Sequence, residues 1–211
     1  MKILFWNTHN NQDINTTLSE LILENRASIV VLAEYAADMD TLISLLSSHG
    51  LNMKQYINCC DRIKMMGCVD DVEPKMDTQH TTIQVINKDY ILCGVHLNSQ
   101  MYSGNMGYRE ILIAQLIQDI QNVEKELKTE NTMIVGDFNI NPYDTSCIDA
   151  RFFHGIPIFE ETKRKERTIA GKSFKMFYNP MWNFLGDFNE PYGTYYYNGN
   201  DSNSTYWNIY D

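Results

Sequence analysis

The sequence MIVGDFNINP, at residues 133–142, begins as an apolar run and changes abruptly to Gly-Asp-Phe-Asn and then a proline. The apolar part predicts a buried strand at residues 132–136, and the glycine, aspartate and asparagine that follow predict a turn. An ordinary turn, however, does not require a carboxylate and a carboxamide two residues apart at the tip of a buried strand. For this stretch alone an ordinary turn is a more common interpretation than a functional site. The choice between the two therefore depends on the residues at the ends of the other strands.

Other apolar runs in the chain resemble this strand, because they are continuous and rich in β-branched residues. Such runs are typical of strands buried on both faces. The predicted order is a strand at 2–6, a helix, a strand at 28–33, a helix from Asp38, short strands and a loop in 52–80, strands at 81–86 and 90–95 joined by a tight turn, a helix at about 105–128, and the strand at 132–136. The remaining part is rich in aromatic residues, and we expect short strands and long loops there. The pattern predicts an α/β fold.

The composition limits the class of protein. With 211 residues, 44% of them hydrophobic and 21% charged, the chain predicts one soluble globular domain that spans residues 1–211. Its apolar runs are too short to span a membrane, and its N-terminus becomes polar too early for a signal peptide, so we expect a cytoplasmic protein. The formal net charge of −10 argues against broad electrostatic binding of nucleic acid. It is compatible with an enzyme whose carboxylates bind metal ions, because bound divalent cations reverse the local field.

One basic run departs from this acidic character. Lys163, Arg164 and Lys165 are consecutive, and Arg167 follows after a single glutamate. A solvated loop is the ordinary interpretation of such a run, and a loop that contacts phosphate is the alternative. Both interpretations stay open at the level of the sequence.

Polar side chains follow several of the predicted buried strands, at the residue where each strand stops. They are Asn7, Glu34, His96, and the pair Asp137 and Asn139. Burial of these groups in an apolar interior is unfavourable unless they have polar partners. Each one alone is more often a surface or structural residue than a member of a functional site. If the strands lie in one layered core, their ends form a cluster of carboxylate, amide and imidazole groups. Oxygen ligands suit Mg²⁺ or Mn²⁺, and an imidazole with a carboxylate suits acid–base chemistry near a phosphate.

This ordered set of residues resembles the endonuclease/exonuclease/phosphatase superfamily, which includes deoxyribonucleases, apurinic endonucleases, sphingomyelinases and inositol polyphosphate 5-phosphatases. The Gly-Asp-Phe-Asn sequence after a strand is the most specific part of the resemblance, which extends over essentially the whole chain. It implies a two-layered β-sandwich flanked by helices, with the active site where the strand ends meet.

The resemblance also implies a role for each residue. Glu34 would be the main Mg²⁺ ligand, with Asn7 beside it, and Asp137 would lie in the metal site and orient or deprotonate the attacking water. Asn139 would hold Asp137 and a phosphate oxygen. His96 would stabilise charge on the phosphoryl group or on the leaving oxygen, and the reaction would be an in-line attack of water on phosphorus.

Two further residues match less closely. Arg109 lies in the helix that follows the histidine strand, where a contact with phosphate competes with an ordinary salt bridge. Asp211 corresponds to the aspartate that orients the final histidine of the family, with a register one residue off. The Ser-Asp-His strand that completes the family's site is not present in these 211 residues, so we expect a domain that is incomplete at its C-terminus. A fragment of a longer protein and a degenerate member of the family are the two interpretations, and both stay open.

The resulting hypothesis is a Mg²⁺-dependent phosphodiesterase that acts on nucleic acid. A catalytically impaired binding module that keeps the scaffold is one alternative, and a phosphatase of small-molecule or lipid phosphates is another. For this 211-residue form we expect weak or absent activity. Membrane binding is not expected, and the oligomeric state is left open.

Overall fold

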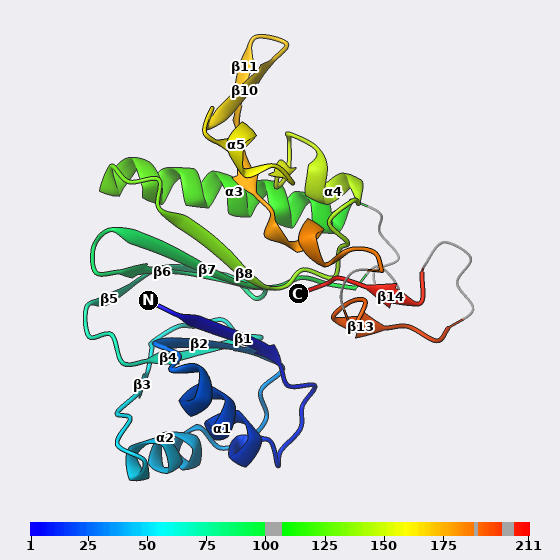
Figure 1. The fold of residues 1–211 in the computed structure, drawn as a ribbon. Helices are drawn as coiled ribbons and strands as arrows, with labels where there is room; N and C mark the ends of the chain where they lie inside the picture. Colours follow the sequence, from blue (N-terminus) through cyan, green and yellow to red (C-terminus); the bar gives the residue numbers. More distant parts are fainter. Residues whose placement is uncertain (100–106, 188–189, 200–204) are drawn as a thin grey trace. The chain divides into compact units, whose positions relative to one another are not determined.

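The computed structural model describes residues 1–99, 107–187, 190–199 and 205–211 (Figure 1). The chain divides into two units, and each of them combines separate segments of the sequence. Unit 1 consists of Met1–Leu97 and Asp119–Asp137, and unit 2 consists of Asn98–Gln118 and Phe138–Asp211. The prediction of a single domain over residues 1–211, incomplete at its C-terminus, stays a prediction.

Unit 1 contains two four-stranded sheets and their helices. Its elements are β1 (Ile3–Asn7), α1 (Asn15–Asn25), β2 (Ile29–Ala33), α2 (Met39–Ser48), β3 (Lys54–Gln55), β4 (Ile63–Gly67), β5 (Val72–Asp77), β6 (Thr81–Ile86), β7 (Tyr90–His96), the C-terminal part of α3 (Tyr108–Leu127) and β8 (Thr132–Asp137). The first sheet has the order β1-β2-β4-β3 and the second has the order β5-β6-β7-β8. Two pairs of neighbouring strands are parallel, β1 with β2 and β7 with β8, so the C-terminal ends of each pair lie at the same edge of their sheet.

Strand β2 shows why the two sheets form a sandwich, because all five of its residues are buried. Val30 and Leu32 pack in a core with residues of α1 and α2, which cover the outer face of the first sheet. Ile29 and Val31 point to the opposite face and pack with Leu92 and other residues of the second sheet. A strand covered on both faces has apolar side chains at every position, which is the pattern seen in the sequence.

The second sheet is covered on its outer face as well. Its strands carry buried apolar side chains on that face, among them Ile83 and Val85, and Figure 1 shows the C-terminal part of α3 running alongside the sheet. The Thr132 hydroxyl on β8 donates a hydrogen bond to the Glu124 carboxylate on α3, which connects the helix to the sheet. The fold is therefore the predicted α/β sandwich of two sheets with flanking helices. The part of the chain that the structure describes contains no helix with the length and apolar character needed to cross a membrane.

Unit 2 is built from short elements connected by loops, as predicted for the aromatic-rich part of the chain. Besides the N-terminal part of α3 it contains α4 (Thr145–Ile148), β9 (Gly155–Ile156), α5 (Phe159–Thr162), β10 (Glu166–Ile169), β11 (Lys172–Lys175), β12 (Phe177–Tyr178), the 3₁₀ helix η1 (Pro180–Phe184), β13 (Tyr195–Tyr196) and β14 (Trp207–Asn208). Three two-stranded sheets are formed by β10 with β11, β9 with β12, and β13 with β14. The buried Asn141 amide connects distant parts of the unit, because its Oδ1 accepts a hydrogen bond from Ile209 N at 2.9 Å and its Nδ2 donates to Asn208 Oδ1 at 3.0 Å.

Candidate active site

Strand register brings four of the predicted residues to the end of the sandwich. In the first sheet, Asn7 lies opposite Ala33, and Glu34 follows directly. In the second sheet, His96 lies opposite Asp137 at the ends of β7 and β8. Side chains alternate along β1 and β8, so Asn7 and Asp137 lie on the faces of the two sheets that pack against each other. They follow the last apolar residues of the core between the sheets.

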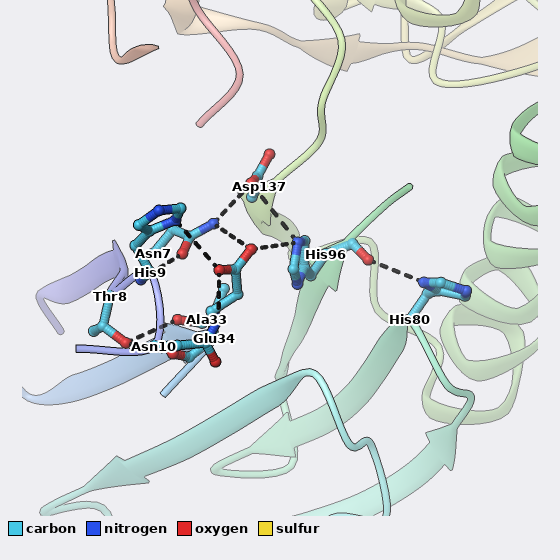
Figure 2. Close-up of polar contacts among 9 residues, drawn as sticks. All are labelled: Asn7, Thr8, His9, Asn10, Ala33, Glu34, His80, His96 and Asp137. Carbon is cyan, nitrogen blue, oxygen red and sulfur yellow. Dashed lines mark hydrogen bonds and ion pairs between the residues drawn. The ribbon is translucent and has the colours of Figure 1, made fainter. Parts of the chain in front are cut away.

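The side chains of these four residues contact one another (Figure 2). Asn7 Nδ2 donates a hydrogen bond to Asp137 Oδ2 at 2.9 Å and a longer one to Glu34 Oε1 at 3.4 Å. The His96 Nε2 atom lies 3.4 Å from Glu34 Oε1 and 3.8 Å from Asp137 Oδ2. One amide and one imidazole therefore lie between two carboxylates that are more than 100 residues apart in the sequence.

The position of Glu34 depends on its backbone conformation. Strand alternation would place its side chain on the helix-covered face with Val30 and Leu32, but Glu34 has a φ of 49°, which breaks the alternation. A left-handed conformation of this kind is unfavourable for a glutamate and persists only where the surroundings hold it. Here the carboxylate lies beside Asn7 and His96 instead.

The segment after β1 supplies the groups that hold Glu34. Thr8 Oγ1 donates to the Glu34 carbonyl at 2.8 Å, and Asn10 N donates to the same carbonyl at 2.9 Å. The Asn10 side-chain amide donates to Glu34 Oε2 at 3.1 Å, and His9 Nδ1 lies 3.6 Å from that oxygen. These three residues were not among those predicted from the sequence. The signal for them was the uninterrupted polar run directly after Asn7.

Gly136 allows the second sheet to bring its two site residues together. It has a φ of +151° and lies opposite Val95, one residue before the pair formed by His96 and Asp137. A Cβ atom at this position would lie only 1.9 Å from the Val95 carbonyl oxygen. The glycine of Gly-Asp-Phe-Asn is therefore required by a close approach of two backbones.

The site is largely shielded from solvent on the side of the second sheet. His96 is 7% exposed and Asp137 is 8% exposed. Burial lowers the pKa of His96 below its usual value, and this effect outweighs the opposing influence of Asp137 and Glu34. An imidazole of lowered pKa is neutral at pH 7, so His96 does not balance the negative charge of the two carboxylates. Its Nδ1 atom is buried without a hydrogen-bond partner among the described residues.

The chemistry of the donor set fits a hard divalent cation held partly by water. Among the residues that the structure describes, no three His, Cys, Asp or Glu side chains have the arrangement of a complete metal site. Mg²⁺, however, is commonly bound by one or two carboxylates together with water and substrate phosphate, and Glu34 and Asp137 offer two carboxylates. Asn7 presents its nitrogen to them, because its Oδ1 accepts a hydrogen bond from His9 N at 3.0 Å. Its predicted role as a metal ligand stays a prediction, as do those of Glu34 and Asp137.

The other predicted residues lie in unit 2. Arg109 is 4% exposed, and its Nη1 donates a hydrogen bond to the Asn139 carbonyl at 3.0 Å. Asp211 N donates to Thr194 Oγ1 at 3.3 Å, and burial raises the pKa of the Asp211 side chain. The structure thus joins Arg109 and Asn139 within unit 2, as it joins Asn7, Glu34, His96 and Asp137 within unit 1. The substrate-binding and catalytic roles of these unit 2 residues stay predictions.

Comparison with known proteins defines the class of fold. No protein-family model and no curated protein match this sequence. Among solved structures, the human Nocturnin catalytic domain, with bound sulfate anion, is similar over 71% of this chain and 69% of its own, with 15% identity and a TM-score of 0.50. The 3′-5′ exonuclease NExo from Neisseria meningitidis shares 22% identity over 71% of this chain, with a TM-score of 0.47, and this chain spans 62% of it. An endonuclease/exonuclease/phosphatase family protein from Leptotrichia buccalis is 16% identical over 67% of each chain, with a TM-score of 0.44.

The chain shares the fold of the Nocturnin catalytic domain, an α/β sandwich of two sheets with flanking helices. This finding confirms the fold that the resemblance in the sequence implied.

Proposed function

We propose that this protein is a divalent-metal-dependent phosphoester hydrolase that cleaves phosphodiester bonds in nucleic acid by in-line attack of water. The observation that carries the proposal is the convergence of four residues at the end of a sandwich of this fold, where Asn7 and His96 each lie 2.9–3.8 Å from the carboxylates of Glu34 and Asp137. Polar groups of these types, collected where a core ends, supply the charge and hydrogen bonds that phosphoryl transfer requires.

Each residue has a part in this reaction that its contacts support. Asp137 is the base that orients the water and accepts its proton, and the hydrogen bond from Asn7 holds its carboxylate in place. Because burial keeps His96 neutral, this residue donates a hydrogen bond to a phosphoryl oxygen in the transition state. Glu34 is held by Thr8 and Asn10 so that its carboxylate faces the same space. A divalent cation held by Glu34 and Asp137 would supply charge stabilisation to the phosphoryl oxygens.

The test is hydrolysis of DNA, RNA and bis(p-nitrophenyl) phosphate with and without Mg²⁺ or Mn²⁺. We expect weak cleavage that requires the metal, and we expect Glu34→Gln and Asp137→Asn each to lower kcat by about 10²-fold or more. Glu20→Gln is the matched control, since it removes one negative charge from an exposed position of α1. Binding of Mn²⁺, followed by calorimetry, should weaken in Glu34→Gln and stay unchanged in the control.

The outcomes separate the alternatives. Metal-dependent release from a p-nitrophenyl phosphomonoester without cleavage of any polynucleotide would replace the nuclease with a phosphatase. No turnover of any phosphoester by a protein that binds Mn²⁺ would refute the proposed function and favour a binding module.

A further inference from the structure

The strongest concentration of positive charge in this acidic protein lies in one exposed hairpin. Residues 163–175, called the basic hairpin below, contain six of the 17 lysines and arginines of the chain and only one acidic residue. This segment has a formal charge of +5, whereas the whole chain has a formal charge of −10. The remainder of the chain therefore repels polyanions, and the basic hairpin attracts them.

Strands β10 and β11 form this hairpin, and Figure 1 shows it extending outward from the rest of unit 2. All four residues of β10 are exposed. An isolated two-stranded hairpin that buries so little gains little stability from its side chains. Packing in a core therefore does not explain why six cations are placed here.

The strand register sorts the side chains onto two faces. Arg167 pairs with Phe174, and Ile169 pairs with Lys172, so these four side chains share one face. The opposite face contains Glu166, whose carboxylate accepts a hydrogen bond from Ser173 Oγ at 3.0 Å. The first face thus presents two cations beside an aromatic and an aliphatic side chain, without an acidic residue.

Several of these cations have no carboxylate to neutralise them. Lys163 pairs with Glu160 at 2.6 Å. Arg164, Arg167 and Lys172, in contrast, have no Asp or Glu oxygen within 4.0 Å in the described part of the chain. Exposed cations that are not paired with acidic groups retain their full attraction for an anionic partner.

We propose that the basic hairpin binds the phosphate backbone of nucleic acid through Arg164, Arg167 and Lys172. A two-stranded ribbon is one of the elements that fit the major groove of a duplex, and guanidinium groups bind phosphate oxygens in a bidentate manner. The proposal rests on the proposed function for the choice of nucleic acid among polyanions. It extends that function by adding a binding surface formed by residues other than the proposed catalytic ones.

An anionic membrane is the main competing partner, and the hairpin suits it less. Stable binding to a membrane surface requires apolar area that inserts between the headgroups, in addition to positive charge. Within the basic hairpin, Ile169 is the one well-exposed large apolar side chain, with 41% exposure. The charge of the hairpin therefore favours a partner that is recognised by its phosphates.

The test measures binding of a short fluorescein-labelled DNA duplex by fluorescence anisotropy at several salt concentrations, in EDTA so that no hydrolysis occurs. The hairpin variant combines Arg164→Gln, Arg167→Gln and Lys172→Gln. The matched control combines Lys2→Gln, Lys88→Gln and Lys125→Gln, which removes the same charge from exposed positions of unit 1. Circular dichroism establishes that both variants are folded.

We expect the hairpin variant to bind the duplex at least about tenfold more weakly at low salt, and the control to bind nearly as well as the unsubstituted protein. Losing three phosphate contacts should also reduce the slope of log Kobs against log salt by about 2.7. Equal affinities of the two variants would overturn the proposal, as would binding of the hairpin to phosphatidylserine vesicles but not to the duplex. Because EDTA and anisotropy remove catalysis from this measurement, the two proposals can fail separately. Binding through the hairpin here, together with no hydrolysis in the separate assay with Mg²⁺ or Mn²⁺, would contradict the proposed function and leave this inference intact.

Discussion

Replacing Gly136 with alanine should damage both the stability of the protein and its candidate active site. The new Cβ atom would lie 1.9 Å from the Val95 carbonyl oxygen and 2.8 Å from the Val95 backbone carbon and nitrogen. Real Cβ atoms do not come this close to other atoms, so β8 has to move away from β7 at this position. The φ of +151° adds strain of its own for any residue with a side chain.

The cost follows from what this movement breaks. Separation of the strands at the pair Val95 and Gly136 disturbs the backbone hydrogen bonds there and at the next pair, His96 and Asp137. Two lost hydrogen bonds at about 1 kcal/mol each, with about 1–3 kcal/mol of backbone strain, give a destabilisation on the order of 3–5 kcal/mol. For a chain of this size that corresponds to a Tm lower by about 10 °C. A displacement of about 1 Å at His96 and Asp137 would also lower kcat by about 10²-fold.

Urea unfolding followed by circular dichroism measures the loss of stability, with Gly50→Ala as the control. Gly50 also has a positive φ, +81°, but no atom lies within 4 Å of the position of its Cβ, so this variant should lose only about 1 kcal/mol. Both variants place a side chain at a positive φ, and only Gly136→Ala adds a clash with a neighbouring backbone. If Gly136→Ala were no less stable than Gly50→Ala, the close approach of β7 and β8 would not be the reason for this glycine.

Three other predictions concern the site and the core. Asn10→Gly removes the amide that donates to Glu34 Oε2 and keeps a residue that tolerates the φ of 56°. We expect about tenfold lower kcat and a change in the free energy of unfolding below about 1 kcal/mol. An unchanged kcat would show that the amide does not position Glu34. Val30→Ala and Val31→Ala should each destabilise the protein by about 2 kcal/mol in urea unfolding, because the two side chains are fully buried on opposite faces of β2. A negligible effect of either substitution would contradict burial of β2 on both faces. Burial raises the pKa of Tyr56 to about 12, above the value of about 10 expected for the unfolded chain, so its contribution to stability is complete below pH 10 and disappears as the pH rises through 12. Between pH 10 and 12 the Tyr56→Phe variant should therefore lose less stability than the unsubstituted protein. Equal losses in the two proteins would contradict the raised pKa of Tyr56.

The sequence by itself determined the order of strands and helices in unit 1 outside residues 52–80, where only short strands and a loop were predicted. It also determined the polar residue at the end of four buried strands. Continuous apolar runs require burial on both faces of a strand. A polar group that ends such a run has to lie outside the apolar core, at the edge of the sheet where the strand ends. For this reason Asn7, His96 and Asp137 could be predicted to meet, because strand alternation carries all three to the face between the sheets. The concentration of positive charge after residue 162 was equally visible in the sequence.

Only the tertiary structure decided how Glu34 joins the site, because alternation alone would send its carboxylate to the helix-covered face. Its φ of 49° is held by Thr8 and Asn10, which are 26 and 24 residues away in the sequence, and no local propensity encodes contacts of that range. In the same way, the identity of Gly136 is explained by its distance to Val95 across the sheet. The register of β10 and β11 places Arg167 and Lys172 on the face opposite to Glu166. Each of these features depends on which backbone lies next to which, and that is settled only when the strands pair and the sheets pack.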